Sequence, residues 1–215
     1  MTWTSRSPRP GLPVAEVRVW RVDLDADRGP DASSLGKDEW RRADRILSPV
    51  SRRRWVSSRL ALRSLLAGHL GLEPAEVVLS AGPTGKPVLA DGALRFNLSH
   101  SGRWALIAVS DREVGVDVER IDVGRDVLRL AGRALGPEIA AQVAAAPRRD
   151  RADLFHRAWA RTEAQAKCFG AGLSGWAPVR PATVTDLCPG AGWAAALAVE
   201  GEPLPIHCFE LVAQA

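Results

Sequence analysis

The sequence predicts an α+β fold made of two similar subdomains, each with helices packed on a small antiparallel sheet. Two observations predict this class: helical patterns are followed by runs of short strand patterns, and this order occurs twice along the 215 residues. The composition agrees, because 46% hydrophobic and 25% charged residues are typical of a globular protein. No apolar run approaches the roughly 20 residues needed to cross a bilayer, so we expect no membrane partner and a cytoplasmic location.

In the first half, apolar and polar residues alternate over residues 17–24, which predicts a half-buried strand. Residues 37–47 are expected to form a helix. Ser48 and Pro49 then supply an N-cap and a first-turn proline, which predict a second helix ending near Leu70. A glycine-rich turn at 82–85 separates the first two of several short strands. These strands are expected at residues 77–80, 87–89, 94–98, 104–110 and 114–118.

The second half repeats this order of helices and strands. Three helices are expected near residues 126–135, after Pro137 and at 151–169. Three strand patterns follow at residues 182–187, 193–200 and 206–212. Asp111 and Arg112 are expected to form a tight turn near the midpoint of the chain. We therefore expect an N-terminal subdomain of residues 1–110 and a C-terminal subdomain of residues 111–215.

Charge is distributed unevenly between the two halves. Residues 1–110 hold 17 Lys and Arg against 11 Asp and Glu, whereas residues 111–215 hold 12 against 14. The first half is therefore suited to an anionic partner, and the second half offers carboxylates. Eight arginines but a single carboxylate, Asp44, lie between residues 41 and 63, and guanidinium groups bind phosphate in a bidentate manner. A solvated helix face would have the same composition.

The segment Gly-Val-Asp-Val-Glu at 115–119 contains the first candidate site. On a strand, Asp117 and Glu119 point to the same face, and two neighbouring carboxylates repel each other unless a cation lies between them. Oxygen ligands in this arrangement suit Mg²⁺, which keeps waters and completes its shell with substrate phosphates. The alternative interpretation is a solvated polar face on an edge strand.

The expected helix at 151–169 contains the second candidate site. Trp159, Glu163 and Lys167 are spaced i, i+4 and i+8, so they lie along one ridge. Glu163 could add a third carboxylate to the metal site, and Lys167 a point charge for a phosphate. A core tryptophan beside a surface ion pair would show the same spacing.

The third candidate is Phe-Asn-Leu-Ser-His-Ser-Gly at 96–102, which follows Gly-Lys-Pro at 85–87. His100, Ser99 and nearby backbone N–H groups at a strand end can donate hydrogen bonds to phosphate. A histidine whose hydrogen bonds are satisfied within the protein is the alternative. A serine hydrolase is a poor fit, because the chain has no G-x-S-x-G motif and Ser99 directly precedes His100.

Taken in order, GKP, FNLSHSG, GVDVE and WxxxEAxxK followed by GxGL resemble the successive signatures of the Sfp-type 4′-phosphopantetheinyl transferases. The resemblance extends from Gly85 to Leu173, and the arginine-rich helices before it fit the same family. It implies two subdomains related by a pseudo-twofold axis. It also implies a holo-[acyl-carrier-protein] synthase, which transfers 4′-phosphopantetheine from coenzyme A to a serine of acyl or peptidyl carrier proteins, with Mg²⁺ or Mn²⁺, and releases 3′,5′-ADP.

The resemblance also implies roles for individual residues. Three of them match the metal ligands: Asp117, Glu119 and Glu163. Six are expected to contact coenzyme A: Lys167, His100, Ser99, Lys86, Arg54 and Arg41. The proton of the carrier serine would pass to Glu163, to Glu138 or to a water on the ion. The family often has Lys before the helix glutamate where this chain has Thr162, so one positive charge is missing or is supplied by Arg161.

Two other functions agree with only part of the sequence. A nucleic-acid-binding module would place exposed aromatic residues among the basic ones, but only Trp40 and Trp55 lie there, and the carboxylates would stay unexplained. We therefore expect no nucleic acid partner. A relative that binds carrier proteins without transferring the group is disfavoured, because all three acidic positions are present. We expect the enzyme to be a monomer.

Overall fold

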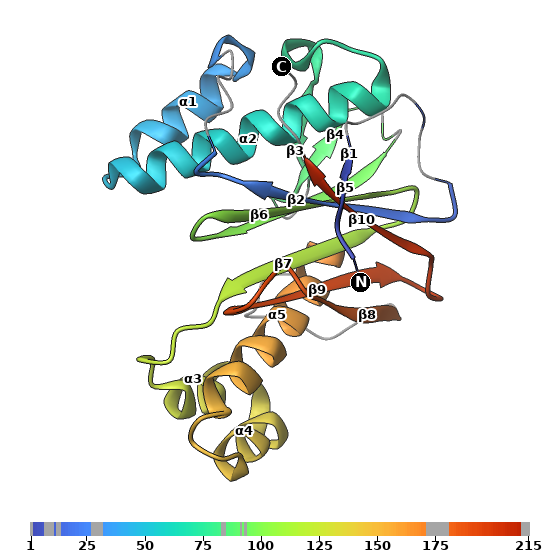
Figure 1. Cartoon of the computed structure of the whole chain (residues 1–215). Helices are drawn as coiled ribbons and strands as arrows, with labels where there is room; N and C mark the ends of the chain where they lie inside the picture. The colour runs from blue at the N-terminus through green and yellow to red at the C-terminus, as the bar shows by residue number, and fades with distance from the viewer. Residues whose placement is uncertain are drawn as a thin grey trace.

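The computed structural model describes residues 2–6, 11, 14–26, 32–82, 85–90, 92, 94–170 and 181–211. Its elements stack in four layers, which are helix, sheet, sheet and helix (Figure 1). The helix α2 (Pro49–Leu70) covers a five-stranded sheet, a three-stranded sheet lies against the other face of that sheet, and α5 (Arg151–Phe169) covers the far side. The predicted α+β class is confirmed, and the pseudo-twofold relation stays a prediction.

The five-stranded sheet includes a strand from the end of the chain. Its order is β1 (Thr4–Arg6), β10 (Ile206–Leu211), β2 (Val17–Asp23), β6 (Trp104–Ser110) and β5 (Arg95–Ser101). β10 runs parallel to both of its neighbours, so this sheet is mixed and the expectation of a purely antiparallel sheet is wrong. An alternating pattern predicts a strand and its two faces but not its partners. β10 therefore belongs to the second half of the sequence but to the sheet of the first half, so the expected subdomain boundary near residue 110 does not separate the two sheets completely.

The three-stranded sheet is antiparallel, as expected, with the order β7 (Val114–Arg120), β9 (Trp193–Glu200) and β8 (Ala182–Leu187). The valines of β7 at 114, 116 and 118 point into the core between the two sheets. The odd-numbered residues of β7 therefore lie on the side of α5. On that side, small residues of α5 pack on the alanines Ala196 and Ala198 of β9. This strand alternation directs Asp117 and Glu119 toward α5.

The arginine-rich region forms two helices, of which α2 lies over the five-stranded sheet and α1 (Lys37–Asp44) packs against α2. The helix α1 ends before the predicted residue 47, because residues 45–48 make the turn into α2. Ser48 caps α2 as predicted, since its Oγ accepts a hydrogen bond from the backbone N–H of Ser51 at 3.3 Å. The helix ends at Gly71, whose φ of 70° is the left-handed conformation typical of a helix C-cap.

The remaining elements are short. A hairpin of β3 (Leu79–Ala81) and β4 (Pro87–Leu89) lies beside β5, and part of its predicted turn, residues 83–84, lies outside the described residues. Two helices, α3 (Val127–Ala134) and α4 (Gly136–Ala145), pack against the first half of α5. Single 3-10 turns occupy Ala32–Ser34 and Pro74–Glu76. Within the described part of the chain, no helix is long and apolar enough to span a membrane.

Candidate functional site

Polar side chains of β5 bond to the backbone of β7 and join the two sheets. Three of them lie on one face of β5, and each accepts a hydrogen bond from a β7 N–H group. The pairs are Asn97 with Val116 at 2.9 Å, Ser99 with Val118 at 3.4 Å, and Ser101 with Arg120 at 3.2 Å. The period of two along a strand puts Leu98 and His100 on the opposite face. The FNLSHS segment therefore joins the sheets through Asn97, Ser99 and Ser101, and it lines a cleft with Leu98, Ser99 and His100.

Asp117 is the most buried of the predicted metal ligands, with 3% of its surface exposed. Its Oδ1 accepts hydrogen bonds from Ser99 Oγ at 2.8 Å and from Lys167 Nζ at 2.5 Å. Its Oδ2 is buried and has no hydrogen-bond partner among the described residues. A buried carboxylate oxygen without a partner is costly, so this atom is suited to a ligand that the protein itself does not supply.

Glu119 and Glu163 lie in the same electrostatic environment as Asp117. Burial, together with the charge of Asp117, raises the pKa of Glu119 above its ordinary value, although Lys167 and a hydrogen bond from Trp159 oppose the shift. Burial also raises the pKa of Glu163, where Lys167 opposes the shift and Asp117 adds to it. The negative charge of Asp117 therefore acts on both of the other carboxylates.

The chemistry of these three carboxylates suits a divalent cation, but in this structure they do not form a complete metal-binding site. Among the described residues, no group of three or more Asp, Glu, His or Cys side chains is arranged to hold a metal ion. The Lys167 ammonium instead lies against Asp117. The unpartnered Oδ2 and the raised pKa of the two glutamates are what a cation between the carboxylates would relieve. The donor set therefore fits Mg²⁺ or Mn²⁺.

A cleft of about 870 Å³ opens beside this acidic group, between α1, α2, the β3–β4 hairpin and β5. Its size is within the range of ligand-binding pockets. Seven of the side chains that line it are basic: Lys37, Arg41, Arg42, Arg59, Arg63, His100 and Lys167. Burial lowers the pKa of His100, and the nearby charges of Lys167, Arg59 and Arg42 lower it further. The cleft is therefore electropositive around His100 and suits a polyanion.

The arginines that line the cleft differ in part from those expected. Arg41, which stays a predicted coenzyme A contact, lines it and forms an exposed ion pair with Asp38 at 2.9 Å. Arg54 does not line it, and its Nε and Nη2 donate hydrogen bonds to the two carboxylate oxygens of Asp25, at 2.8 and 2.7 Å. Arg42, Arg59 and Arg63 also lie in its wall, and none of them was among the six expected contacts. The helical period could have selected Arg59, which shares a face of α2 with the cleft residues at 55, 58 and 63.

Glu39 fixes the positions of two arginines in the cleft wall, Arg59 and Arg63. Its two carboxylate oxygens accept hydrogen bonds from Arg59 Nε at 3.0 Å and from Arg63 Nε at 2.7 Å. Burial alone would raise the pKa of Glu39, but hydrogen bonds from the Gly36 N–H, Arg63 and Arg59 outweigh it and lower the pKa. The side chain is 13% exposed, so this network links α1 to α2 beneath the cleft.

Two of the expected cofactor contacts have their hydrogen bonds used within the protein. Ser99 Oγ donates to Asp117 and accepts from Lys167 Nζ at 3.1 Å. Lys86 Nζ donates to three oxygens at the junction of β7 and α5, and Lys86 is absent from the residues lining the cleft. Ser99 does line the cleft, so it stays a predicted cofactor contact. Lys86 requires a different interpretation.

Glu138, one of the two carboxylates expected to take the serine proton, and Arg161, the expected replacement charge, lie farther out. Glu138 is exposed in the first turn of α4, and no described contact joins it to the other acidic residues. Thr162 Oγ1 donates to the backbone carbonyl of Ala158 at 3.0 Å. Arg161 is exposed and pairs with Asp186 at 2.9 Å. The replacement charge that Arg161 was expected to supply therefore stays a prediction.

Comparison with known proteins gives family matches over both halves. A family described as "4'-phosphopantetheinyl transferase superfamily" matches residues 113–211, and one described as "4'-phosphopantetheinyl transferase, N-terminal" matches residues 31–112. The chain is 34% identical over 223 residues to the 4'-phosphopantetheinyl transferase HetI of Nostoc sp., covering 93% of this chain and 94% of that protein.

Two further relatives match over about half of the chain. The 4'-phosphopantetheinyl transferase Sfp of Bacillus subtilis is 29% identical over 114 residues, which are 53% of this chain and 50% of that protein. A phosphopantetheinyl transferase of Thraustochytrium sp. is 32% identical over 120 residues, or 51% of this chain and 42% of that protein.

Proposed function

Because this chain belongs to the 4′-phosphopantetheinyl transferase superfamily and is a transferase, we propose that it moves the phosphopantetheine arm of coenzyme A onto a serine hydroxyl of an acyl or peptidyl carrier protein. The observation that carries the proposal is the electropositive cleft beside Asp117. Coenzyme A carries a pyrophosphate and a 3′-phosphate, so it matches a cleft that has basic walls and a cluster of three carboxylates at one side.

The basic residues of the cleft would bind the phosphates of coenzyme A. His100 lies near Lys167, Arg59 and Arg42, each of which lowers its pKa, so an incoming phosphate would meet several donors at once. We assign the 3′-phosphate to His100 and the pyrophosphate to Lys167, which is close to the acidic group. Arg41 would add an outer contact, whereas Arg54 is committed to Asp25.

Asp117, Glu119 and Glu163 would hold Mg²⁺ or Mn²⁺, which when bound would neutralise charge on the pyrophosphate. The protein's own part is to keep Asp117 Oδ2 free of internal partners and to hold Lys167 beside the site. The carrier serine oxygen forms a bond to the phosphorus as the bond to 3′,5′-ADP breaks. Glu163 lies in the acidic group beside Asp117, whereas Glu138 is exposed on α4, so Glu163 is better placed to take the serine proton.

The test is incubation of the protein with coenzyme A, Mg²⁺ and a panel of apo carrier proteins, read by intact mass. We expect one carrier or more to gain the mass of a single phosphopantetheine group and 3′,5′-ADP to appear in equal amount. A carrier whose acceptor serine is changed to alanine is the control and should gain nothing. Absence of any mass gain across fatty-acid, polyketide and peptide carriers would overturn the proposal. We expect the active species to be a monomer.

A further inference from the structure

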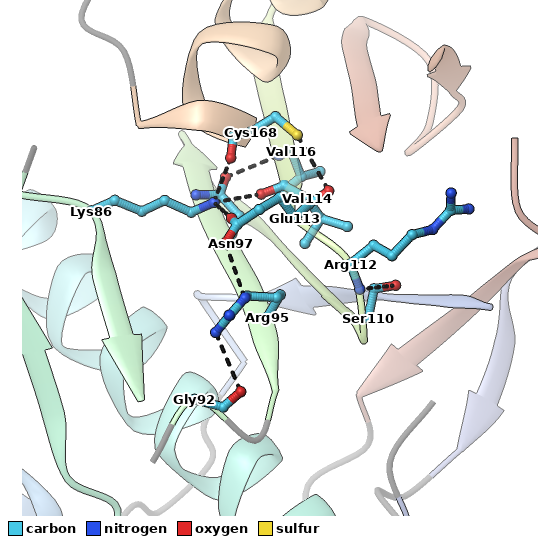
Figure 2. Close-up of polar contacts among 10 residues, drawn as sticks. All are labelled: Lys86, Gly92, Arg95, Asn97, Ser110, Arg112, Glu113, Val114, Val116 and Cys168. Atoms are coloured by element: carbon cyan, nitrogen blue, oxygen red, sulfur yellow. Dashed lines mark hydrogen bonds and ion pairs between the residues drawn. The ribbon is translucent and has the colours of Figure 1, made fainter. Parts of the chain in front are cut away.

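Lys86 lies in the turn between β3 and β4 but points away from the cleft that its neighbours line. Gly85 and Pro87 are both part of the cleft wall. The Lys86 side chain instead reaches across to the start of β7 and the end of α5 (Figure 2). It is 11% exposed, so it is almost enclosed at the junction between the two halves of the molecule.

The ammonium of Lys86 uses all of its hydrogen-bonding capacity there. It donates to Glu113 Oε2 at 2.8 Å, to the Val114 carbonyl at 3.0 Å and to the Cys168 carbonyl at 2.8 Å. An ammonium group has three N–H donors. Each therefore has an acceptor, and no donor is left for a phosphate. We call Lys86, Glu113 and the carbonyls of Val114 and Cys168 the α5 anchor.

The Cys168 carbonyl is one of the last four of α5, which have no partner within the helix. A cation at this end of a helix also interacts favourably with the helix dipole. Lys86 therefore caps α5 from a segment far away in the sequence. Glu113 is itself held by Arg95 at 3.0 Å, so the anchor is fixed to β5 as well (Figure 2).

The helix end that the anchor holds contains the residues that face the acidic site. Lys167 is adjacent to Cys168 in sequence, and Glu163 lies one turn before Lys167. Asp117 lies on β7, the strand whose start provides Glu113 and Val114 to the anchor. A shift of the α5 end relative to β7 would therefore move Glu163 and Lys167 away from Asp117.

We propose that Lys86 is a positioning residue for the transfer reaction, and not a contact to coenzyme A. It fixes the end of α5 on β7 and thereby sets the distance between Lys167, Glu163 and Asp117. This inference rests on the proposed function, because the distance that it sets matters only for the reaction assigned to that site.

The test is the steady-state kinetics of Lys86→Met, which keeps the length of the side chain but removes the charge and the donors. We expect kcat to fall about 10- to 100-fold, the effect of a misplacement of about 1 Å, while the KM for coenzyme A changes less than threefold. Lys86→Arg should restore most of kcat. Lys37→Met, a change in the cleft wall, should give the opposite pattern, a raised KM with kcat retained.

A partner variant separates positioning from general damage. Glu113→Gln should lower kcat in the same way, and the double variant Lys86→Met with Glu113→Gln should be less harmful than the product of the two single effects. A raised KM with unchanged kcat in Lys86→Met, wild-type kinetics in that variant, or fully multiplicative effects would each overturn the inference. Inactivity of the wild-type protein with every carrier would instead overturn the proposed function.

Discussion

Gly115→Ala is expected to damage both stability and activity, although the change adds a single methyl group. Gly115 lies on β7, where α5 crosses the strand so closely that no side chain fits. A Cβ at this position would lie 2.0 Å from the Ala164 carbonyl oxygen and 2.3 Å from the Cys168 nitrogen. Both are backbone atoms of α5, so the clash cannot be relieved by turning a side chain.

The distances give the size of the effect. Real Cβ atoms essentially never come within 3.0 Å of such neighbours, so α5 must recede from β7 by about 1 Å or more. Overpacking of this kind typically costs about 1–3 kcal/mol of stability. The same displacement separates Glu163 and Lys167 from Asp117, and a misplacement of about 1 Å in a reacting site lowers rates by about 100-fold.

The assay combines urea denaturation with transfer kinetics on the folded protein. Gly132→Ala is the matched control, because a Cβ at this position in α3 meets nothing within 4 Å. That control should be neutral or stabilise the protein by up to about 1 kcal/mol, since alanine is the better helix former, and its activity should be unchanged. Wild-type stability and rate in Gly115→Ala would refute the close approach of α5 to β7.

Three further predictions concern the acidic group, the cleft and its wall. Asp117→Asn, Glu119→Gln and Glu163→Gln should each lower transfer by about 100-fold or more with unchanged circular dichroism, because each would remove a metal ligand; full activity would take that residue out of the site. His100→Ala should raise the KM for coenzyme A about tenfold but hardly alter that for dephospho-coenzyme A, which lacks the 3′-phosphate; equal effects with both substrates would contradict the assignment. Glu39→Gln should cost about 1–3 kcal/mol of stability at pH 7. The pKa of Glu39 in the folded protein lies below its ordinary 4.5, so the stability that Glu39 contributes is complete above pH 4.5 and is lost as the pH falls through the folded pKa. Thermal unfolding of both proteins at decreasing pH measures this loss. A difference in stability between Glu39→Gln and wild type that stays constant down to pH 3 would contradict the prediction.

Local patterns predicted the faces of the strands better than their neighbours. The alternation at 114–119 places Asp117 and Glu119 on one face of a strand, and β7 has the valines on the other face, as predicted. The cap at Ser48 also follows from local chemistry. The position of β10 between β1 and β2 depends on contacts between distant segments, and a period-2 pattern carries no information about such contacts.

The direction of individual long side chains was the least predictable part of the site. The resemblance to the transferase family placed Lys86 and Arg54 among the cofactor contacts, because they lie where the family has basic coenzyme A contacts. In the structure, Lys86 binds backbone and carboxylate oxygens behind the cleft, and Arg54 binds Asp25. Competing acceptors elsewhere in the fold decide this, and none of them is close in sequence to the residue it attracts.

The place of β10 has a consequence for how the molecule is made. β10 lies between β1 and β2, so the five-stranded sheet stays incomplete until residues 206–211 have left the ribosome. Until then β2 has an unpaired edge, which is a site for aggregation, and the core beneath α2 lacks Phe209 and Leu211. Pairing over such a sequence separation is slow to form. β5, which lines the cleft, belongs to this same sheet, so a substitution in β10 would act on the support of the cleft from a distant part of the chain.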